Sequence, residues 1–448
     1  MHKATTMLCT LPLLAACAVG PDYAEPSIEL SREFVSGPAS ALPDPGNDAW
    51  WRAFNDSYLN GLVDRGLEQN LSILTVLSRI EQAEANVRTT GLNANLDGSL
   101  SASRTASRRG DQDRVYSTDG TLSGSFILDF FGGSRRSREQ AIAQLEAAGF
   151  DAGAARLAFL TSLTTNYINA RFNQESAALT RRTIDSRQET LRLVEQRRAV
   201  GAASQLELVQ SRADLESAQA DLPVFNAGFE AAVFAIATLL AEPAGPLMTQ
   251  MQRGAAQPLP RGTGSTGVPA DLLRNVPSVR AAERNFAAAV ANVGASEAAL
   301  YPSITLSGNV TESSGALDTW SFGPTINLPL LNRGRLIAQR DAAAAAAEEA
   351  EIAWRAAVLD AVEDVEVSAS ALRNSRRSLA AQRRAVASND EALDLSRETY
   401  EAGALTLLDL LDVERTTSNQ RLSLATAQRE LATDWIALQI ATGRGWGG

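Results

Sequence analysis

The sequence predicts a mainly α-helical membrane protein built from two copies of one unit, with four membrane-type β-strands in each chain. Three observations predict this fold. The chain repeats itself at offsets of 200 to 206 residues, four short segments alternate apolar with small polar residues, and two helical segments are far longer than those of globular domains.

The first residues, MHKATTMLCTLPLLAAC, have the layout of a lipoprotein signal peptide. Lys3 gives a positive start, an apolar stretch follows, and the sequence LAAC, which ends at Cys17, resembles a bacterial lipobox. We therefore expect residues 1–16 to be removed and Cys17 to carry a lipid that anchors the chain to a membrane. The alternative is an ordinary signal peptide with an incidental cysteine.

The composition after this cleavage excludes several classes of function. Cleavage removes His2 and Cys9, which are the only histidine and the only other cysteine. Histidine-based catalysis, Cys or His metal sites and disulfides are then excluded for the mature chain. Of the catalytic types considered, catalysis by carboxylates alone remains possible. The sequence has no phosphate-binding loop, so we expect neither an enzyme nor a cofactor. The net charge of −11, or −12 without Lys3, argues against nucleic acid.

The internal repeat sets the predicted domain boundaries. A shift of 206 places ANV at 85–87 on ANV at 291–293, and a shift of 202 places Gly201 on Gly403. We expect the following order: signal peptide 1–16, lipidated N-terminal segment 17–59, first repeat 60–241, connector 242–268, second repeat 269–442 and C-terminal tail 443–448.

Each repeat contains two predicted strands. They lie near 98–107 and 120–130 in the first copy, and near 302–311 and 320–330 in the second. Alternation with period two, apolar on one side and hydroxyl-bearing on the other, is typical of membrane β-barrel strands. The alternative is a soluble sheet with one wet face. Because an open sheet edge is forbidden in lipid, a barrel needs several chains: two give eight strands and three give twelve.

Very long helices are predicted over 134–199 and 334–402, each about 100 Å long at 1.5 Å per residue. Shorter helical segments are expected at 67–95, 203–241, 269–300 and 406–442, packed side by side in coiled-coil fashion. After the signal no uninterrupted apolar run reaches about 18 residues, so we expect no transmembrane helix.

Two similar phrases, GAASQLELVQ at 201–210 and GALTLLDLLD at 403–412, follow the long helices. Gly201 and Gly403 can end the incoming helix in a left-handed conformation. The phrases therefore predict a helix–turn–helix tip in each copy.

The polar residues of both phrases resemble helix caps. Ser204 with Glu207, and Thr406 with Asp409, match the capping-box pattern at the start of the outgoing helix. Capping does not explain Asp412, whose counterpart in the first copy is neutral. The ordinary interpretation of Asp412 is a solvated surface acid.

Five motifs along the chain resemble the TolC-like outer membrane factor family. They are CAVGPDY (17–23), WWRAFND (50–56), ILDFFGGSRR (127–136), YPSITLSG (301–308) and GALTLLDLL (403–411). Because of the predicted lipid on Cys17, the chain resembles the efflux-pump lipoprotein branch of this family, of the resistance–nodulation–division or NodT type. The resemblance implies a homotrimer in which a twelve-stranded β-barrel continues into a long α-helical periplasmic barrel.

The resemblance also implies a function. Such proteins are passive exit ducts of tripartite efflux systems in Gram-negative bacteria, and they dock on a periplasmic adaptor and an inner membrane transporter, commonly of the resistance–nodulation–division class. The positions that match Asp409 and Asp412 form a constriction at the periplasmic end, and Tyr400 matches an aromatic of the tip linkages. The rival functions are a duct for type I protein secretion and a structural coiled-coil envelope lipoprotein.

Overall fold

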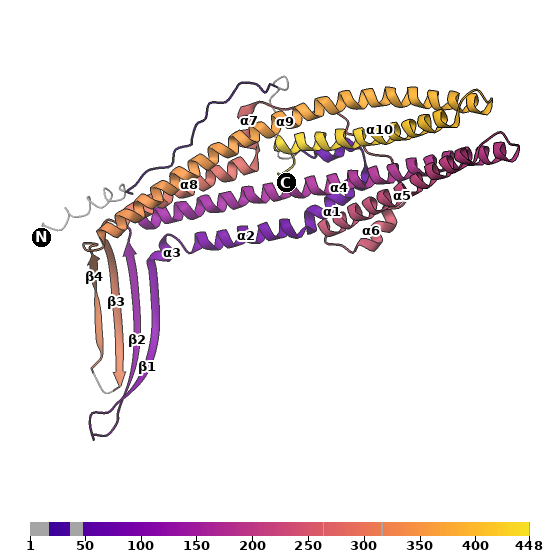
Figure 1. Ribbon diagram of the computed structural model, residues 1–448. Helices are drawn as coiled ribbons and strands as arrows, with labels where there is room; N and C mark the ends of the chain where they lie inside the picture. Colours follow the sequence, from indigo (N-terminus) through magenta and orange to yellow (C-terminus); the bar gives the residue numbers. More distant parts are fainter. Residues whose placement is uncertain (1–17, 36–47, 263, 315–316, 448) are drawn as a thin grey trace. The chain divides into compact units, whose positions relative to one another are not determined.

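The computed structural model describes residues 18–35, 48–262, 264–314 and 317–447. The predicted signal peptide and Cys17 lie outside these residues. The predicted fold class is confirmed, because long helices and one four-stranded sheet make up the chain (Figure 1).

The sheet is antiparallel, with its strands side by side in sequence order. They are β1 (Leu96–Ser107), β2 (Val115–Leu128), β3 (Ser303–Ser314) and β4 (Thr319–Asn327). Because β2 pairs with β3, the sheet joins the two copies of the repeat. Within the described chain β1 and β4 are edge strands, each hydrogen-bonded on one side only.

The strand register separates two faces, as the alternating pattern predicts. One row across the four strands is apolar and consists of Leu100, Leu122, Val310 and Trp320. All four of these side chains are exposed. The neighbouring row is polar and consists of Ser99, Ser123, Asn309 and Ser321. An apolar face that no part of the described chain covers is the pattern of strands whose outer side meets lipid.

The helices begin and end close to their predicted limits where the pattern is regular. The long helices are α4 (Gly133–Ala199) and α9 (Arg333–Glu401), and their outgoing partners are α5 (Gln205–Leu239) and α10 (Leu407–Ala441). The others are a short 3-10 helix (Trp50–Phe54), α1 (Ser57–Gln69), α2 (Leu71–Arg88), α3 (Leu92–Asn95), α6 (Ala244–Met251), α7 (Pro269–Asn275) and α8 (Pro277–Ala298).

Two predicted helices are broken in the structure. The segment 67–95 is interrupted at Asn70, which is extended at ψ 125° and whose side-chain oxygen caps α2 by accepting the N–H groups of Ser72 and Ile73. The segment 269–300 is interrupted at Val276, because Pro277 disfavours a helical conformation in the residue before it.

Among the described helices, α5 is a candidate membrane span that the search for an uninterrupted apolar run did not predict. By length and composition alone this helix passes the test for a membrane span, although it includes Pro223 in its interior. A single helix of this kind is weak evidence of a membrane span.

The chain forms two compact units, and each unit takes segments from both copies of the repeat. The first comprises Met1–Glu29, Val76–Asp151 and Ser278–Val358, and it holds the sheet. The second comprises Leu30–Thr75, Ala152–Pro277 and Leu359–Gly448, and it holds both helix–turn–helix tips.

Aromatic residues of the WWRAF segment help to form the core of the second unit. The ring of Trp435 on α10 lies 5.9 Å from that of Trp50 and 5.3 Å from that of Phe54, edge to face in both cases. The indole N–H of Trp50 donates to the carbonyl of Arg444 at 3.1 Å. These contacts fix the N-terminal segment against the C-terminal end of α10.

Two glycines of α1 allow a matched test of packing. A Cβ at Gly66 would lie 2.1 Å from Phe159 Cζ, whereas a Cβ at Gly61 would meet nothing within 4 Å. We expect Gly66→Ala to destabilise the protein by about 1–3 kcal/mol through overpacking. Gly61→Ala should be neutral or stabilise it by up to about 1 kcal/mol. Thermal unfolding in detergent, followed by circular dichroism, measures both; equal melting temperatures would contradict the packing described.

Candidate gate at the hairpin tips

Each long helix ends at a glycine in the left-handed conformation, with φ of 77° at Gly201 and 78° at Gly403. The N–H of the residue after each glycine donates to the carbonyl five residues earlier, at 2.8 Å in the first tip and 3.0 Å in the second. This 6→1 bond closes the helix end and satisfies a carbonyl that the helix leaves free. The glycines therefore turn the chain tightly at both tips.

The outgoing helices are capped differently. Ser204 and Glu207 form a reciprocal capping box: the Ser204 N–H donates to the Glu207 carboxylate at 2.6 Å, and the Glu207 N–H donates to Ser204 Oγ at 3.2 Å. This backbone bond lowers the pKa of Glu207. In the second tip the Asp409 N–H donates to Thr406 Oγ1 at 3.3 Å, but the Asp409 carboxylate accepts the Thr406 hydroxyl instead of its N–H.

Tyr400 lies inside the tip region, with only 2% of its surface exposed. It packs with Val194, Leu393, Leu407, Leu410 and Leu411 in one apolar cluster. The guanidinium of Arg197, on the first hairpin, lies 4.6 Å from the Tyr400 ring centre, and its Nη1 donates to the Tyr400 carbonyl at 3.1 Å. Burial raises the pKa of the Tyr400 phenol. Tyr400 thus joins the two hairpins.

Asp409 and Asp412 both lie on the exposed side of α10. The Asp412 side chain is 62% exposed and forms an ion pair with Arg415, one helical turn later. Arg415 was not among the residues predicted from the sequence, although an acid followed by a base three residues later is a recognisable helix pair. The second aspartate therefore has a basic partner within its own helix.

A buried carboxylate, Glu414, links the second hairpin to the first. It is 2% exposed, and its Oε1 accepts hydrogen bonds from Ser186 at 3.1 Å and Thr190 at 2.9 Å, both on α4. Arg397 on α9 donates to the same oxygen at 3.1 Å. This cluster could not be recognised in the sequence, because its members are separated by up to 228 residues.

Within the first hairpin Arg187 on α4 pairs with Asp214 on α5 at 2.8 Å. Burial raises the pKa of Asp214, while the charges of Arg187 and Arg415 oppose that rise. Arg415 of the second hairpin is therefore close enough to act electrostatically on the first. Polar contacts thus connect the two hairpins at several levels near their tips.

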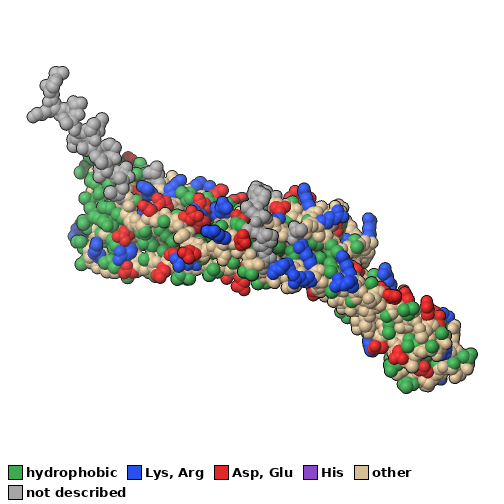
Figure 2. Space-filling model, turned by 90° about the horizontal axis from the view of Figure 1, so that it is seen from above, with side chains coloured by type: hydrophobic (Ala, Val, Ile, Leu, Met, Phe, Trp, Pro, Cys, Tyr) green, Lys and Arg blue, Asp and Glu red, His purple; other side chains and the backbone are tan. Residues whose placement is uncertain are grey.

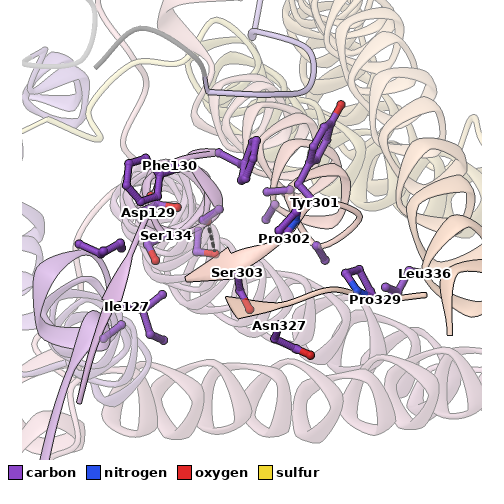
Figure 3. Close-up of a pocket in the computed structure, with 18 of the residues that line it drawn as sticks. Ile127, Asp129, Phe130, Ser134, Tyr301, Pro302, Ser303, Asn327, Pro329 and Leu336 are labelled. Carbon is purple, nitrogen blue, oxygen red and sulfur yellow. Dashed lines mark hydrogen bonds between the residues drawn. The ribbon is translucent and has the colours of Figure 1, made fainter. Parts of the chain in front are cut away.

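A separate cavity of about 510 Å³ lies in the first unit, where the strands meet the helices (Figure 3). Residues of both copies line it, among them Phe130 and Asp129 after β2, and Pro329 and Asn327 at the end of β4. The rings of Phe131 and Tyr301 stack at its wall with centres 4.8 Å apart. We call this junction of strands and helices, residues 128–133 and 328–333, the elbow.

The chain matches known proteins over nearly its whole length. The family model described as outer membrane efflux protein matches residues 62–242 and 268–444. Nodulation protein T of Rhizobium leguminosarum bv. trifolii is 38% identical over 447 residues, which is 97% of this chain and 96% of that protein. The pyoverdine export outer membrane protein OpmQ of Pseudomonas aeruginosa is 30% identical, covering 99% of this chain and 97% of the relative.

Solved structures agree with these sequence matches. The outer-membrane channel OprN superposes with a TM-score of 0.86 at 28% identity, covering 96% of this chain and 100% of the other. The open state of the Neisseria gonorrhoeae MtrE outer membrane channel superposes with a TM-score of 0.83 at 26% identity, covering 96% and 99%.

The buried position of Glu414 generates a prediction. Glu414→Gln leaves Arg397 without its charged partner, so we expect a loss of about 1–3 kcal/mol of stability. Hydrogen exchange should become faster for the backbone amides around 400–415. Glu398→Gln, at an exposed position of α9, is the matched control and should change stability by less than about 0.5 kcal/mol. Unchanged exchange in Glu414→Gln would show that the cluster does not hold the hairpins.

Proposed function

We propose, from the premise that this chain belongs to the outer membrane efflux protein family, that three copies of it form the exit duct of a tripartite efflux pump. The family is one of channel proteins, located in the outer membrane of Gram-negative bacteria and extending into the periplasm. The chain is accordingly an outer membrane efflux channel. Its trimeric state, its partners and its gate are the proposed part.

One observation carries the proposal: the four-stranded sheet has an exposed apolar face and two unpaired edges in the described chain. In hydrocarbon each unpaired backbone group costs several kcal/mol, so only a closed sheet can cross a membrane. Pairing β4 of one copy with β1 of the next satisfies both edges. Three copies give the twelve strands that the family resemblance implies.

The hairpin tips support docking on other proteins of the pump. Apolar side chains are exposed there at Val200, Leu206 and Leu408. Exposed apolar residues at the hairpin tips are suited to contact with a periplasmic adaptor. Such an adaptor would join the duct to an inner membrane transporter of the resistance–nodulation–division type. The cargo would be small molecules such as drugs or toxic compounds, selected by the transporter.

The gate would be formed where α10 of the three copies meets the axis. Each chain would contribute the carboxylates of Asp409 and Asp412, together with the guanidinium of Arg415 that pairs with Asp412. A ring with excess acid attracts cations, and the arginines reduce that excess. Tyr400 and Arg197 would hold the tips together while the ring is closed.

The lipid anchor is tested first. Cys17 should be the lipidated residue, because it ends the lipobox-like sequence LAAC. Its acyl chains would hold the protein in the membrane, each buried methylene contributing about 0.8 kcal/mol. Metabolic labelling with palmitate should occur in the native protein and disappear in Cys17→Ser. Labelling that persists in the variant would refute the assignment. Because the barrel can still insert, we expect only partial loss of function.

Two measurements test the duct and its gate. Native mass spectrometry should show a trimer, and this trimer should conduct ions in planar bilayers. Asp412→Asn should weaken both cation preference and block by multivalent cations, whereas Arg415→Gln should strengthen them. Removing the Asp409 carboxylate should weaken cation preference and cation block in the same way as Asp412→Asn. It should also lower stability by about 0.5–2 kcal/mol, because α10 loses a cap.

Glu207→Gln is the matched control, because this acid lies at the first tip beside the neutral Gln210. It should change selectivity less than Asp412→Asn. Unchanged selectivity in both Asp412→Asn and Arg415→Gln would place the pair on an outer surface. A stable, functional monomer would overturn the duct itself.

A further inference from the structure

The first described residues form a strap that is bound to the elbow. We use this name for residues 18–23. The N–H of Val19 donates to the carbonyl of Phe131 at 3.1 Å, directly after β2. Gly20 has φ of +88°, and a Cβ there would lie 2.5 Å from the Cα of Gly294 on α8. Only glycine fits both this conformation and this close approach.

Arg136, in the first turn of α4, directs its guanidinium at the strap. Its Nε donates to the carbonyl of Val19 and its Nη2 to that of Gly20, both at 3.3 Å. Nη2 also donates to the Asp22 carboxylate at 2.7 Å, while Nη1 donates to Glu139 at 2.8 Å. Arg136 is buried, although the Asp22 side chain is exposed. A buried arginine is costly unless its donors are satisfied, and here the strap satisfies most of them.

Tyr23 fixes the strap a second time. Its hydroxyl donates to Glu283 at 2.8 Å, and its ring packs edge to face on Phe286 with ring centres 5.8 Å apart. The guanidinium of Arg284 lies 5.2 Å from the ring centre. All these partners are on α8, within the same compact unit as the strap and the elbow. The strap therefore cannot slide along the helices without losing buried polar contacts.

The elbow to which the strap is bound is strongly apolar. Leu330 and Leu331 are exposed by 75% and 104%, and Phe130 by 39%. Figure 2 shows hydrophobic side chains gathered at the left-hand end of the molecule, where the strands and the first turns of α4 and α9 lie in Figure 1. Arg135 and Arg335 follow close behind in the two copies and are exposed. Apolar residues followed by cations match the boundary between acyl chains and lipid phosphates.

We propose that Arg136, Gly20 and Tyr23 form a clamp that holds the lipidated N-terminus at the elbow, so that the acyl chains and the elbow enter the same phospholipid leaflet. Two peptide steps separate Cys17 from Val19, which limits their separation to about 7 Å. The clamp thus sets the depth at which the anchor holds the strands before the barrel closes. This inference rests on the lipid anchor of the proposed function.

A double-mutant cycle tests the clamp through its effect on assembly. Arg136→Gln should leave palmitate labelling intact but reduce the yield of trimer in the outer membrane at least about threefold, as Cys17→Ser does. In the Cys17→Ser background Arg136→Gln should cause little further loss, because an anchor that is absent cannot be positioned. Arg181→Gln, at an exposed position later in α4, is the matched control and should assemble normally.

Insertion variants separate positioning from folding, because they leave the clamp intact. A Gly-Ser-Gly-Ser insertion between Ala18 and Val19 adds about 13 Å of chain between anchor and clamp. It should lower trimer yield as Arg136→Gln does. The same insertion between Pro38 and Ala39, on the other side of the clamp, should not.

Three outcomes would overturn the proposal. One is equal losses from Arg136→Gln with and without Cys17, which would indicate a purely structural role. The second is normal assembly of the Ala18–Val19 insertion, and the third is absence of palmitate from the native chain. The trimers that do form should conduct normally, so loss of conductance alone would count against the proposed duct and not against the clamp.

Discussion

The hydrogen-bonding groups along the two edges of the sheet are the constraint on which the rest of the structure depends. In the described chain β1 and β4 each have one unpaired side. The apolar row of the sheet that ends at Trp320 is exposed, and its contact with water is unfavourable. A lipid bilayer accepts that apolar row but not the open edges. The chain is therefore stable in a membrane only when other copies supply the missing pairs, and the elbow must present every sheet at the same depth.

The hairpin tips answer a different requirement, since a duct has to be closed and opened. The apolar cluster around Tyr400 joins the two tips, because Val194 of α4 is fully buried in it beside residues of α9 and α10. Polar links add to this contact, through Arg197 and through Glu414. A hydrogen bond to a charged group contributes about 1.5–3 kcal/mol. Separating the hairpins therefore costs both apolar and polar contacts, and these contacts hold the proposed gate closed.

Features with a local cause could be predicted from the sequence. Strand alternation, the glycine turns and the Ser204–Glu207 box depend on residues within a few positions of each other, and the structure has all of them. The break at Asn70 was missed because no proline or glycine marks it. The Glu414 cluster and the Arg136 contacts could not be predicted, because most of their partners lie more than a hundred residues away and are brought together only by packing.

The structure also explains why only one copy of the tip phrase carries a second aspartate. The shift of 202 that places Gln210 on Asp412 also places Ala213 on Arg415. A neutral pair in the first copy therefore corresponds to an ion pair in the second, and these two positions add no net charge. The second copy therefore differs from the first by one negative and one positive charge, which lie one turn apart on the exposed side of α10. A ring built from such pairs presents alternating signs, so salt will screen it over about 8 Å at physiological strength. In the proposed gate, the selectivity of this ring should then be weaker than that of unpaired carboxylates, and Arg415 would be the residue that adjusts it.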